Sequence, residues 1–141
     1  MKLKFFNTMK TKLNSILTLS AIAVFTLVSF TVTQDDWEVP AKYKNMENEY
    51  AGEDEDEIGE DLYKQHCRSC HGKEGYGDGS KAKELDTEMR DITIEKVQGQ
   101  TDGELYYKAI IGRDEMPNFE KKIRDEEDRW MVINYLRSLA E

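Results

Sequence analysis

Two cysteines and a histidine stand together in the stretch "CRSCH", which runs from Cys67 to His71. If this stretch is helical, Cys67, Cys70 and His71 occupy positions i, i+3 and i+4, which lie on one face. The 141-residue chain has no other cysteine. Any chemistry that needs thiols therefore uses both of them here, with an imidazole beside them.

The spacing C-x-x-C-H is typical of the attachment of a c-type haem. Two thiols in this arrangement can each add to a vinyl group of one porphyrin, and the imidazole of the next residue then reaches the iron from the same side. We predict that Cys67 and Cys70 hold one covalently bound haem c through thioether bonds. We also predict that His71 is an axial ligand of the haem iron.

Three other uses of this motif were weighed. A thioredoxin-like dithiol also has C-x-x-C, but it sits in a βαβ pattern that the sequence does not show. A structural zinc site needs four ligands, and Cys67, Cys70, His71 and His66 are too close in sequence to surround one ion. A simple disulfide between the two cysteines is the third alternative.

A six-coordinate haem iron needs a second axial ligand, and no histidine follows His71. The methionines after the motif are Met89, Met116 and Met131. Met131 lies in a predicted helix with apolar neighbours, which favours a packing role, and Met89 lies among polar residues. Met116 precedes Pro117 in a predicted loop between two helices. We therefore predict that Met116 is the second axial ligand.

Apolar residues at helical spacing predict the element that presents the cysteines. Ile58, Leu62, Tyr63 and His66 recur in this way just before Cys67. The glycine-rich stretch that follows the motif breaks regular structure. The connection through residues 72–100 has few large apolar groups, and a compact domain seldom has so long a loop without a purpose.

Capping signals predict two further helices. Thr101 and Glu104 form a T-x-x-E capping box, and Gly112 is well placed to end the helix that starts there. Asp125 is the predicted N-cap of the last helix. The sequence predicts an all-α domain with about three main helices. Because these helices have few apolar residues, we expect a large apolar group to complete the core.

The chain divides into three parts by charge and hydropathy. Residues 1–33 combine a basic start with an apolar run, which is typical of an export signal. They form either a cleaved signal peptide or a retained membrane anchor, with residues 13–33 as the part that contacts the membrane. Residues 34–55 are predicted to be an extended acidic linker, and residues 56–141 the compact domain. We expect the domain to lie in the periplasm, soluble or tethered to the outer side of the cytoplasmic membrane.

Charge is distributed unevenly along the chain. Four of the 20 basic residues and none of the 29 acidic residues precede residue 34, so the remaining part has a net charge of −13. So acidic a body repels nucleic acid, which we therefore exclude as a partner. Five lysines flank the segments expected to border the haem and could form a basic rim there: Lys73, Lys81, Lys83, Lys121 and Lys122.

These motifs resemble the class I cytochromes c, which are small bacterial single-haem electron carriers. The resemblance covers about residues 56–141. Its most specific elements are "CRSCH" and the downstream "MP", supported by Gly59 and Tyr63 on the first helix and "RWMVINYL" on the last. It implies a cytochrome c fold, with three to five helices around one haem that has histidine and methionine ligands. It also implies a close crossing of the two helices, with Gly59 against Tyr135 and with Tyr63 and Trp130 nearby.

One position departs from the family pattern. Members often have a proline after the glycine-rich loop, and its carbonyl accepts a hydrogen bond from the proximal histidine. This chain has Ser80 there. A backbone carbonyl at Gly79 or Ser80 could still accept the bond from the Nδ1–H group of His71, and without it the ring orientation and the reduction potential would differ from the family pattern.

The resemblance implies an electron carrier rather than an enzyme, since iron with both axial positions filled has no site for a substrate. Its partners would be redox proteins, among them membrane respiratory complexes. Two alternatives stay open. One is a haem-based sensor or peroxidase in which Met116 is displaceable, and the other is a haem subunit of a membrane respiratory complex.

Overall fold

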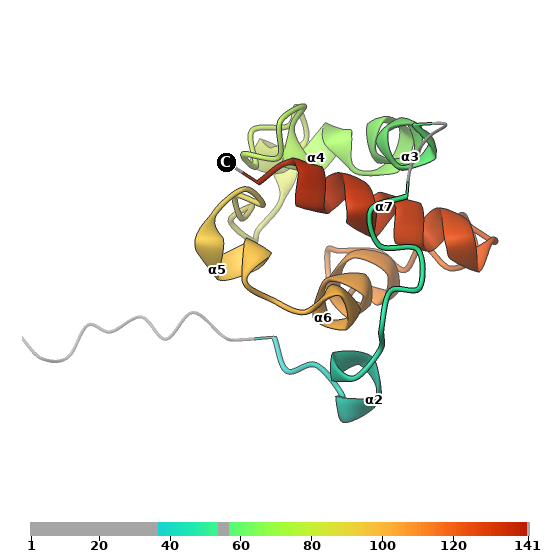
Figure 1. Ribbon diagram of the computed structural model, residues 1–141. Helices are drawn as coiled ribbons and strands as arrows, with labels where there is room; N and C mark the ends of the chain where they lie inside the picture. The colour runs from blue at the N-terminus through green and yellow to red at the C-terminus, as the bar shows by residue number, and fades with distance from the viewer. Residues whose placement is uncertain (1–36, 54–56, 141) are drawn as a thin grey trace, which may run out of the picture. The chain divides into compact units, whose positions relative to one another are not determined.

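The computed structural model of the protein describes residues 37–53 and 57–140 (Figure 1). The predicted signal or anchor, residues 1–33, lies outside the described residues. Among the helices of the described ranges, none combines the length and the hydropathy that crossing a bilayer requires.

The described residues form helices joined by loops. The helices are α2 (Ala41–Lys44), α3 (Ile58–His66), α4 (Arg68–His71), the 3-10 turn η1 (Ala82–Glu84), α5 (Glu95–Gln98), α6 (Asp102–Tyr106), the π-helical turn η2 (Tyr107–Ile111) and α7 (Glu126–Ser138). Within the described ranges there is no strand, and a single isolated bridge joins Arg113 and Met116. The predicted all-α class is confirmed.

The helix starts follow the predicted capping signals. The N–H group of Glu104 donates to Thr101 Oγ1 over 3.2 Å, and the N–H group of Thr101 donates to Glu104 Oε2 over 2.9 Å, which completes the capping box of α6. Asp125 Oδ1 accepts from the N–H group of Glu127 at the start of α7. The α6 helix continues into the wider turn η2, which ends before Gly112 as predicted.

The crossing of α3 and α7 forms the centre of the core (Figure 1). Tyr63 of α3 is 1% exposed, and its ring centroid lies 5.1 Å from that of Tyr135 on α7. Gly59 is buried on the same helix as Tyr63. Trp130 of α7 packs on Tyr106 of α6, with ring centroids 4.6 Å apart. Aromatic packing therefore joins α7 to both α3 and α6.

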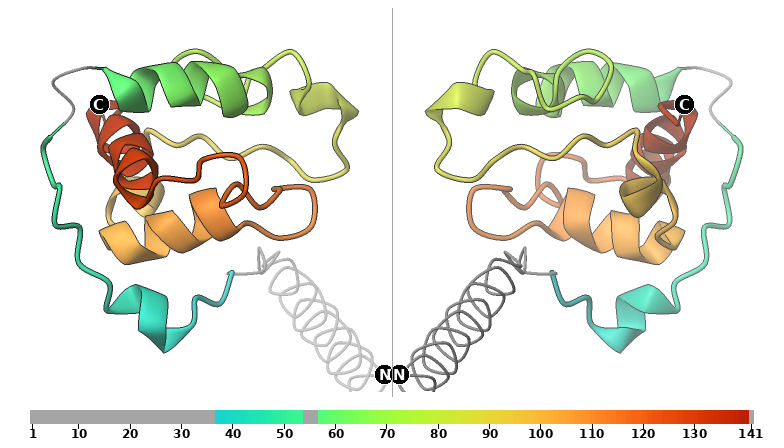
Figure 2. Two further views of the ribbon diagram at one scale, coloured as in Figure 1. Left: turned by 90° about the vertical axis from the view of Figure 1, so that its right-hand side faces the viewer. Right: turned by 90° about the vertical axis from the view of Figure 1, so that its left-hand side faces the viewer.

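The chain between α4 and α5 is the long connection expected from the sequence. It leaves α4, makes the short turn η1 and returns between α3 and α6 before it reaches α5 (Figure 2). The N–H group of Ile92 on the returning part donates to the carbonyl of Gly75 on the outgoing part over 2.8 Å. This bond closes the connection into a loop beside α4.

Residues 38–53, which we call the strap, are held against the domain by aromatic and polar contacts. This segment is part of what we expected to be an extended linker. The Tyr43 ring contacts those of Tyr106 and Tyr107, with centroids 6.4 and 4.7 Å away. Asn134 on α7 donates to the carbonyls of Tyr50 and Glu53, over 2.6 Å in each case. The linker interpretation missed these contacts because they depend on residues more than 50 positions away.

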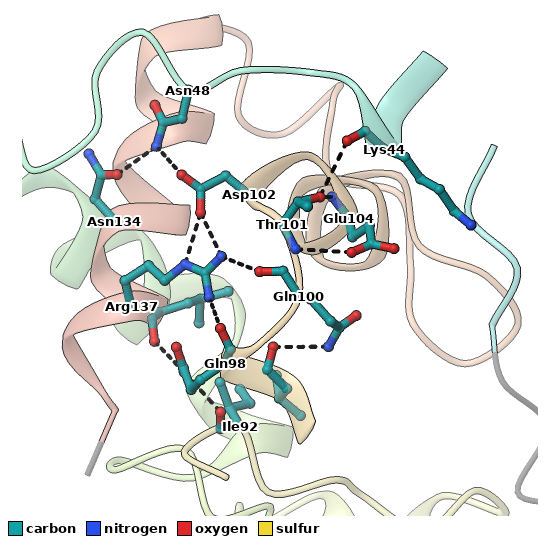
Figure 3. A network of polar contacts seen from close by, with 12 residues as sticks. Lys44, Asn48, Ile92, Gln98, Gln100, Thr101, Asp102, Glu104, Asn134 and Arg137 are labelled. Carbon is teal, nitrogen blue, oxygen red and sulfur yellow. Dashed lines mark hydrogen bonds and ion pairs between the residues drawn. The ribbon is translucent and has the colours of Figure 1, made fainter. Parts of the chain in front are cut away.

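A polar network continues from the strap into the domain (Figure 3). Asn48 Nδ2 bridges Asn134 Oδ1 and Asp102 Oδ2, over 2.8 and 3.3 Å. The Arg137 guanidinium pairs with Asp102 Oδ1 at 2.7 Å and also donates to the carbonyls of Gln98 and Gln100. One half-buried arginine thus satisfies carbonyls at the turn between α5 and α6, where the helices leave them unpaired.

Replacing Asn134 by alanine should loosen the strap. The Asn134→Ala variant loses both bonds to the strap carbonyls, and we expect the free energy of unfolding to fall by about 1–2 kcal/mol. Asn45→Ala, in an exposed part of the strap, is the matched control and should change it by less than about 0.5 kcal/mol. Urea unfolding of the haem-loaded protein measures both values. Equal midpoints for the two variants would contradict the docking of the strap.

Candidate haem site

Cys67 lies between α3 and α4, and α4 carries Cys70 and His71. The N–H group of Cys67 donates to the carbonyl of Tyr63 over 2.9 Å, and the N–H group of His71 donates to the carbonyl of Cys67 over 3.0 Å. Helical hydrogen bonds thus continue from α3 through the motif. Cys67, Cys70 and His71 are all half-buried. This geometry confirms that the motif is helical, as the i, i+3, i+4 argument required.

Cys67 borders the hydrophobic core, and both cysteines are free thiols. Burial raises the pKa of the Cys67 thiol to about 12, and the neighbouring Cys70 adds to the rise. The site therefore disfavours a charged sulfur. A thioether, which is neutral at every pH, suits it.

The imidazole of His71 is neutral at physiological pH, because burial lowers its pKa from the usual value. Neutral imidazole is the form that binds a metal. Its Nδ1 atom is buried and has no hydrogen-bond partner among the described residues. Buried ring nitrogens are normally paired, so Nδ1 of His71 is an exception in the described part of the chain.

The glycine-rich loop lies against α4 through backbone hydrogen bonds. The N–H group of Gly77 donates to the carbonyl of His71 over 2.9 Å, and those of Gly79 and Lys81 donate to Cys70 and Ser69 over 3.1 and 2.8 Å. The hydroxyl of Tyr63 adds a bond to the carbonyl of Gly72 over 2.8 Å. The loop therefore covers α4, yet the carbonyl expected at Gly79 or Ser80 does not accept from His71 Nδ1, and that expectation is wrong for this structure.

Met116 lies in a tight turn next to the core. Its N–H group donates to the carbonyl of Arg113 over 2.8 Å, and its side chain is partly buried against the same hydrophobic cluster that Cys67 borders. Met131 is 4% exposed inside α7, which agrees with a packing role. Met89 is half-buried in the long connection. The structure thus brings Cys67 and Met116 to one cluster, while the assignment of Met116 as ligand stays a prediction.

The residue before Met116 joins this turn to the long connection. Glu115 accepts hydrogen bonds from the N–H groups of Asp86 and Thr87, over 3.0 and 2.8 Å. Bonds from Thr87 and Asp86 hold the pKa of the Glu115 carboxyl below its usual value, so it is a carboxylate at neutral pH. The sequence did not predict this contact, because nothing in the residues around an exposed glutamate in a charged stretch indicates a distant hydrogen-bond partner.

The described residues do not favour the alternatives for the motif. No group of three or more histidine, cysteine, aspartate or glutamate side chains within the described ranges is arranged to hold a metal ion, which weakens the zinc interpretation. Both thiols are free rather than joined in a disulfide. The part of the chain that the structure describes has no strand, so the βαβ setting of a thioredoxin-like dithiol is missing there.

The family model described as "Cytochrome C oxidase, cbb3-type, subunit III" matches residues 54–136, which is more than half of the chain. The chain therefore belongs to this family of c-type cytochrome domains. No curated protein matches it. The predicted class I cytochrome c fold is confirmed, and so is the covalently bound haem c, which a domain of this family carries.

The residues present fit this group. Two free thiols and a neutral imidazole lie together at the junction of α3 and α4. Cys67 and Cys70 would hold the haem and His71 would bind its iron. These individual assignments remain predictions, because the family match concerns the domain as a whole.

A methyl group at Gly79 should disturb the loop that covers α4. An added Cβ would lie 2.5 Å from the carbonyl carbon of Cys70 and in even closer contact with the Ser69 carbonyl, so only glycine allows this approach. We expect Gly79→Ala to lower the free energy of unfolding by about 1–3 kcal/mol, as overpacking does.

The control is Ser80→Ala, a change at the exposed next residue, which should alter the free energy of unfolding by less than about 0.5 kcal/mol. Guanidinium unfolding of both haem-loaded variants, followed by absorption of the haem, gives the comparison. If Gly79→Ala unfolds at the same denaturant concentration as Ser80→Ala, the loop does not pack on α4 as described.

Proposed function

We propose that this c-type haem protein carries one electron at a time between respiratory partners on the outer side of the cytoplasmic membrane. In this proposal Cys67 and Cys70 form the thioethers, and His71 and Met116 are the axial ligands. The observation that carries it is that Cys67 and Met116 are both partly buried against the same hydrophobic core cluster. When bound, the haem supplies reversible one-electron exchange between Fe(III) and Fe(II).

The chain's own residues keep the site unchanged during that exchange. Backbone bonds from Gly77 and Gly79 fix the position of α4, and the hydroxyl of Tyr63 fixes the turn after His71. The packing of Tyr63 on Tyr135 excludes water from the α3 side. A methionine sulfur in the second axial position stabilises Fe(II) and so raises the reduction potential. Filling both axial positions favours electron transfer over reaction with a small molecule.

The proposed location rests on the basic and apolar character of residues 1–33, which is typical of export. Partners would be redox proteins that accept either the acidic body or the five exposed lysines around the site, which are Lys73, Lys81, Lys83, Lys121 and Lys122. Docking would then depend on local charge rather than on net charge.

A second candidate function is a haem subunit of a membrane respiratory complex. The name of the matching family, subunit III of a cbb3-type oxidase, favours it. A retained N-terminal anchor would also suit it. The test is to solubilise membranes of the host in mild detergent, to separate the proteins by size and to detect the haem by its absorption. A free carrier elutes as a small protein, whereas a subunit elutes with a large assembly.

Removal of both thiols should abolish covalent haem attachment. Intact mass of the wild-type protein, matured in a host that attaches haem c, should exceed the mass of the chain by that of one haem. The Cys67→Ala, Cys70→Ala double variant should lose this increment, and denaturing acid-acetone extraction should then remove all colour. A single variant that keeps one cysteine serves as control and should retain the increment. An unmodified wild-type chain with two free thiols would refute the attachment.

Replacement of Met116 should change the iron coordination. The ferric Met116→Ala variant should lose the long-wavelength charge-transfer band of methionine-bound haem. Its reduction potential should be lower than that of the wild type. The difference should be smaller than the roughly 0.8 V that a change of axial ligands spans. Met89→Ala is the matched control, since Met89, like Met116, follows the motif and lies in a loop. Loss of the band in Met89→Ala instead would assign that residue as the ligand, and absence of the band from the wild type would favour the sensor or peroxidase alternative.

A further inference from the structure

The structure joins two loops near the site through a single carboxylate. We infer that Glu115 is a positioning residue that holds Met116 at the iron by fastening its turn to the long connection. We call the contact of the Glu115 carboxylate with the N–H groups of Asp86 and Thr87 the clasp. The inference rests on the proposed role of Met116 as the second axial ligand.

The clasp is specific in geometry. Each oxygen of Glu115 accepts one backbone N–H group, Oε1 from Asp86 over 3.0 Å and Oε2 from Thr87 over 2.8 Å. Two parallel bonds fix the orientation of a planar carboxylate as well as its position. They connect segments that are 28 and 29 residues apart in sequence, so neither bond follows from local chain geometry.

The turn transmits this constraint to Met116, its next residue. The N–H group of Met116 donates back to the carbonyl of Arg113, and Asp114 between them adopts a left-handed conformation with φ of 49°. The chain also folds back on Gly112, where an added Cβ would contact the Met116 carbonyl and lie 2.7 Å from the Pro117 carbonyl. So tight a turn moves as a unit, and displacement of Glu115 displaces Met116.

The other half of the clasp is fixed to the histidine side of the site. The long connection returns to the glycine-rich loop through the bond from Ile92 N–H to the Gly75 carbonyl. That loop in turn donates from Gly77 N–H to the carbonyl of His71 over 2.9 Å. The clasp therefore links the loop that covers α4 to the turn that carries Met116, and its release would let the two separate.

A looser turn would expose the iron more often to an external ligand. The apparent affinity of such a ligand rises in proportion to the fraction of molecules in which Met116 is displaced. The clasp is exposed to solvent, so its release is expected to raise that fraction only roughly three- to tenfold. Imidazole is a suitable probe, since its binding to ferric haem replaces the methionine and removes the charge-transfer band.

The test compares imidazole titrations of ferric, haem-loaded wild type with three variants. Glu115→Ala removes the clasp, and its apparent affinity for imidazole should be about three- to tenfold higher than that of the wild type. Glu115→Gln keeps one acceptor oxygen and should lie between the two. Glu88→Ala removes one negative charge from an exposed residue next to Thr87 and should match the wild type.

Each result of the imidazole titrations either supports or overturns the role of the clasp. Equal affinities for wild type and Glu115→Ala, with the charge-transfer band present in both, would overturn the clasp and leave the proposed function standing. Equal increases in Glu115→Ala and Glu88→Ala would assign the effect to charge and also overturn it. A wild type without the band would overturn both the clasp and the ligand assignment. If Glu115→Ala fails to fold, Glu115→Gln against the wild type gives the same comparison.

Discussion

The burial of Tyr63 is the interaction on which the arrangement depends. Its ring is 1% exposed and packs on Tyr135, so it fixes α3 against α7. Its hydroxyl donates to the carbonyl of Gly72, directly after the motif. One side chain therefore joins the core to the turn that follows His71. Burying a tyrosine is favourable only when its hydroxyl is paired, and here the partner belongs to the site. Core packing and site geometry are consequently determined together.

The strap extends this arrangement beyond the part of the chain that the family model matches. The whole strap precedes the match at 54–136, yet its Tyr43 ring contacts Tyr106 of α6, and its Tyr50 carbonyl accepts a bond from Asn134 of α7. Asp102 receives both Asn48 of the strap and Arg137 of α7, so the network is shared by three segments. Half-buried polar contacts of this kind are individually modest, but removing one member leaves several partners unpaired. A short helical domain gains rigidity from such a network at the edge of its core.

Local signals in the sequence were sufficient for the starts of α6 and α7 and for the motif, but they did not predict α2 or α5. The capping box at Thr101, the N-cap at Asp125 and the stop at Gly112 act within a few residues, and each appears where it was expected. The spacing of Cys67, Cys70 and His71 is local as well. The docking of the strap and the bonds of Glu115 depend on residues far away in the sequence, so no local pattern predicts them. The acceptor expected for His71 was an analogy to a proline; this chain has Ser80 at that position, and Nδ1 of His71 has no hydrogen-bond partner among the described residues.

The two sides of the site are held by different kinds of interaction. On the histidine side, α4 is fixed by helical bonds continuous with α3, by backbone bonds from a tightly packed loop and by a buried tyrosine. On the methionine side, the turn is fixed by exposed hydrogen bonds to a carboxylate, which water can replace. Because exposed polar contacts contribute less than buried packing, local opening should favour the methionine side. If Cys67 and Cys70 hold the haem as proposed, a change of iron coordination would involve the turn of Met116 and would leave the thioether bonds in place.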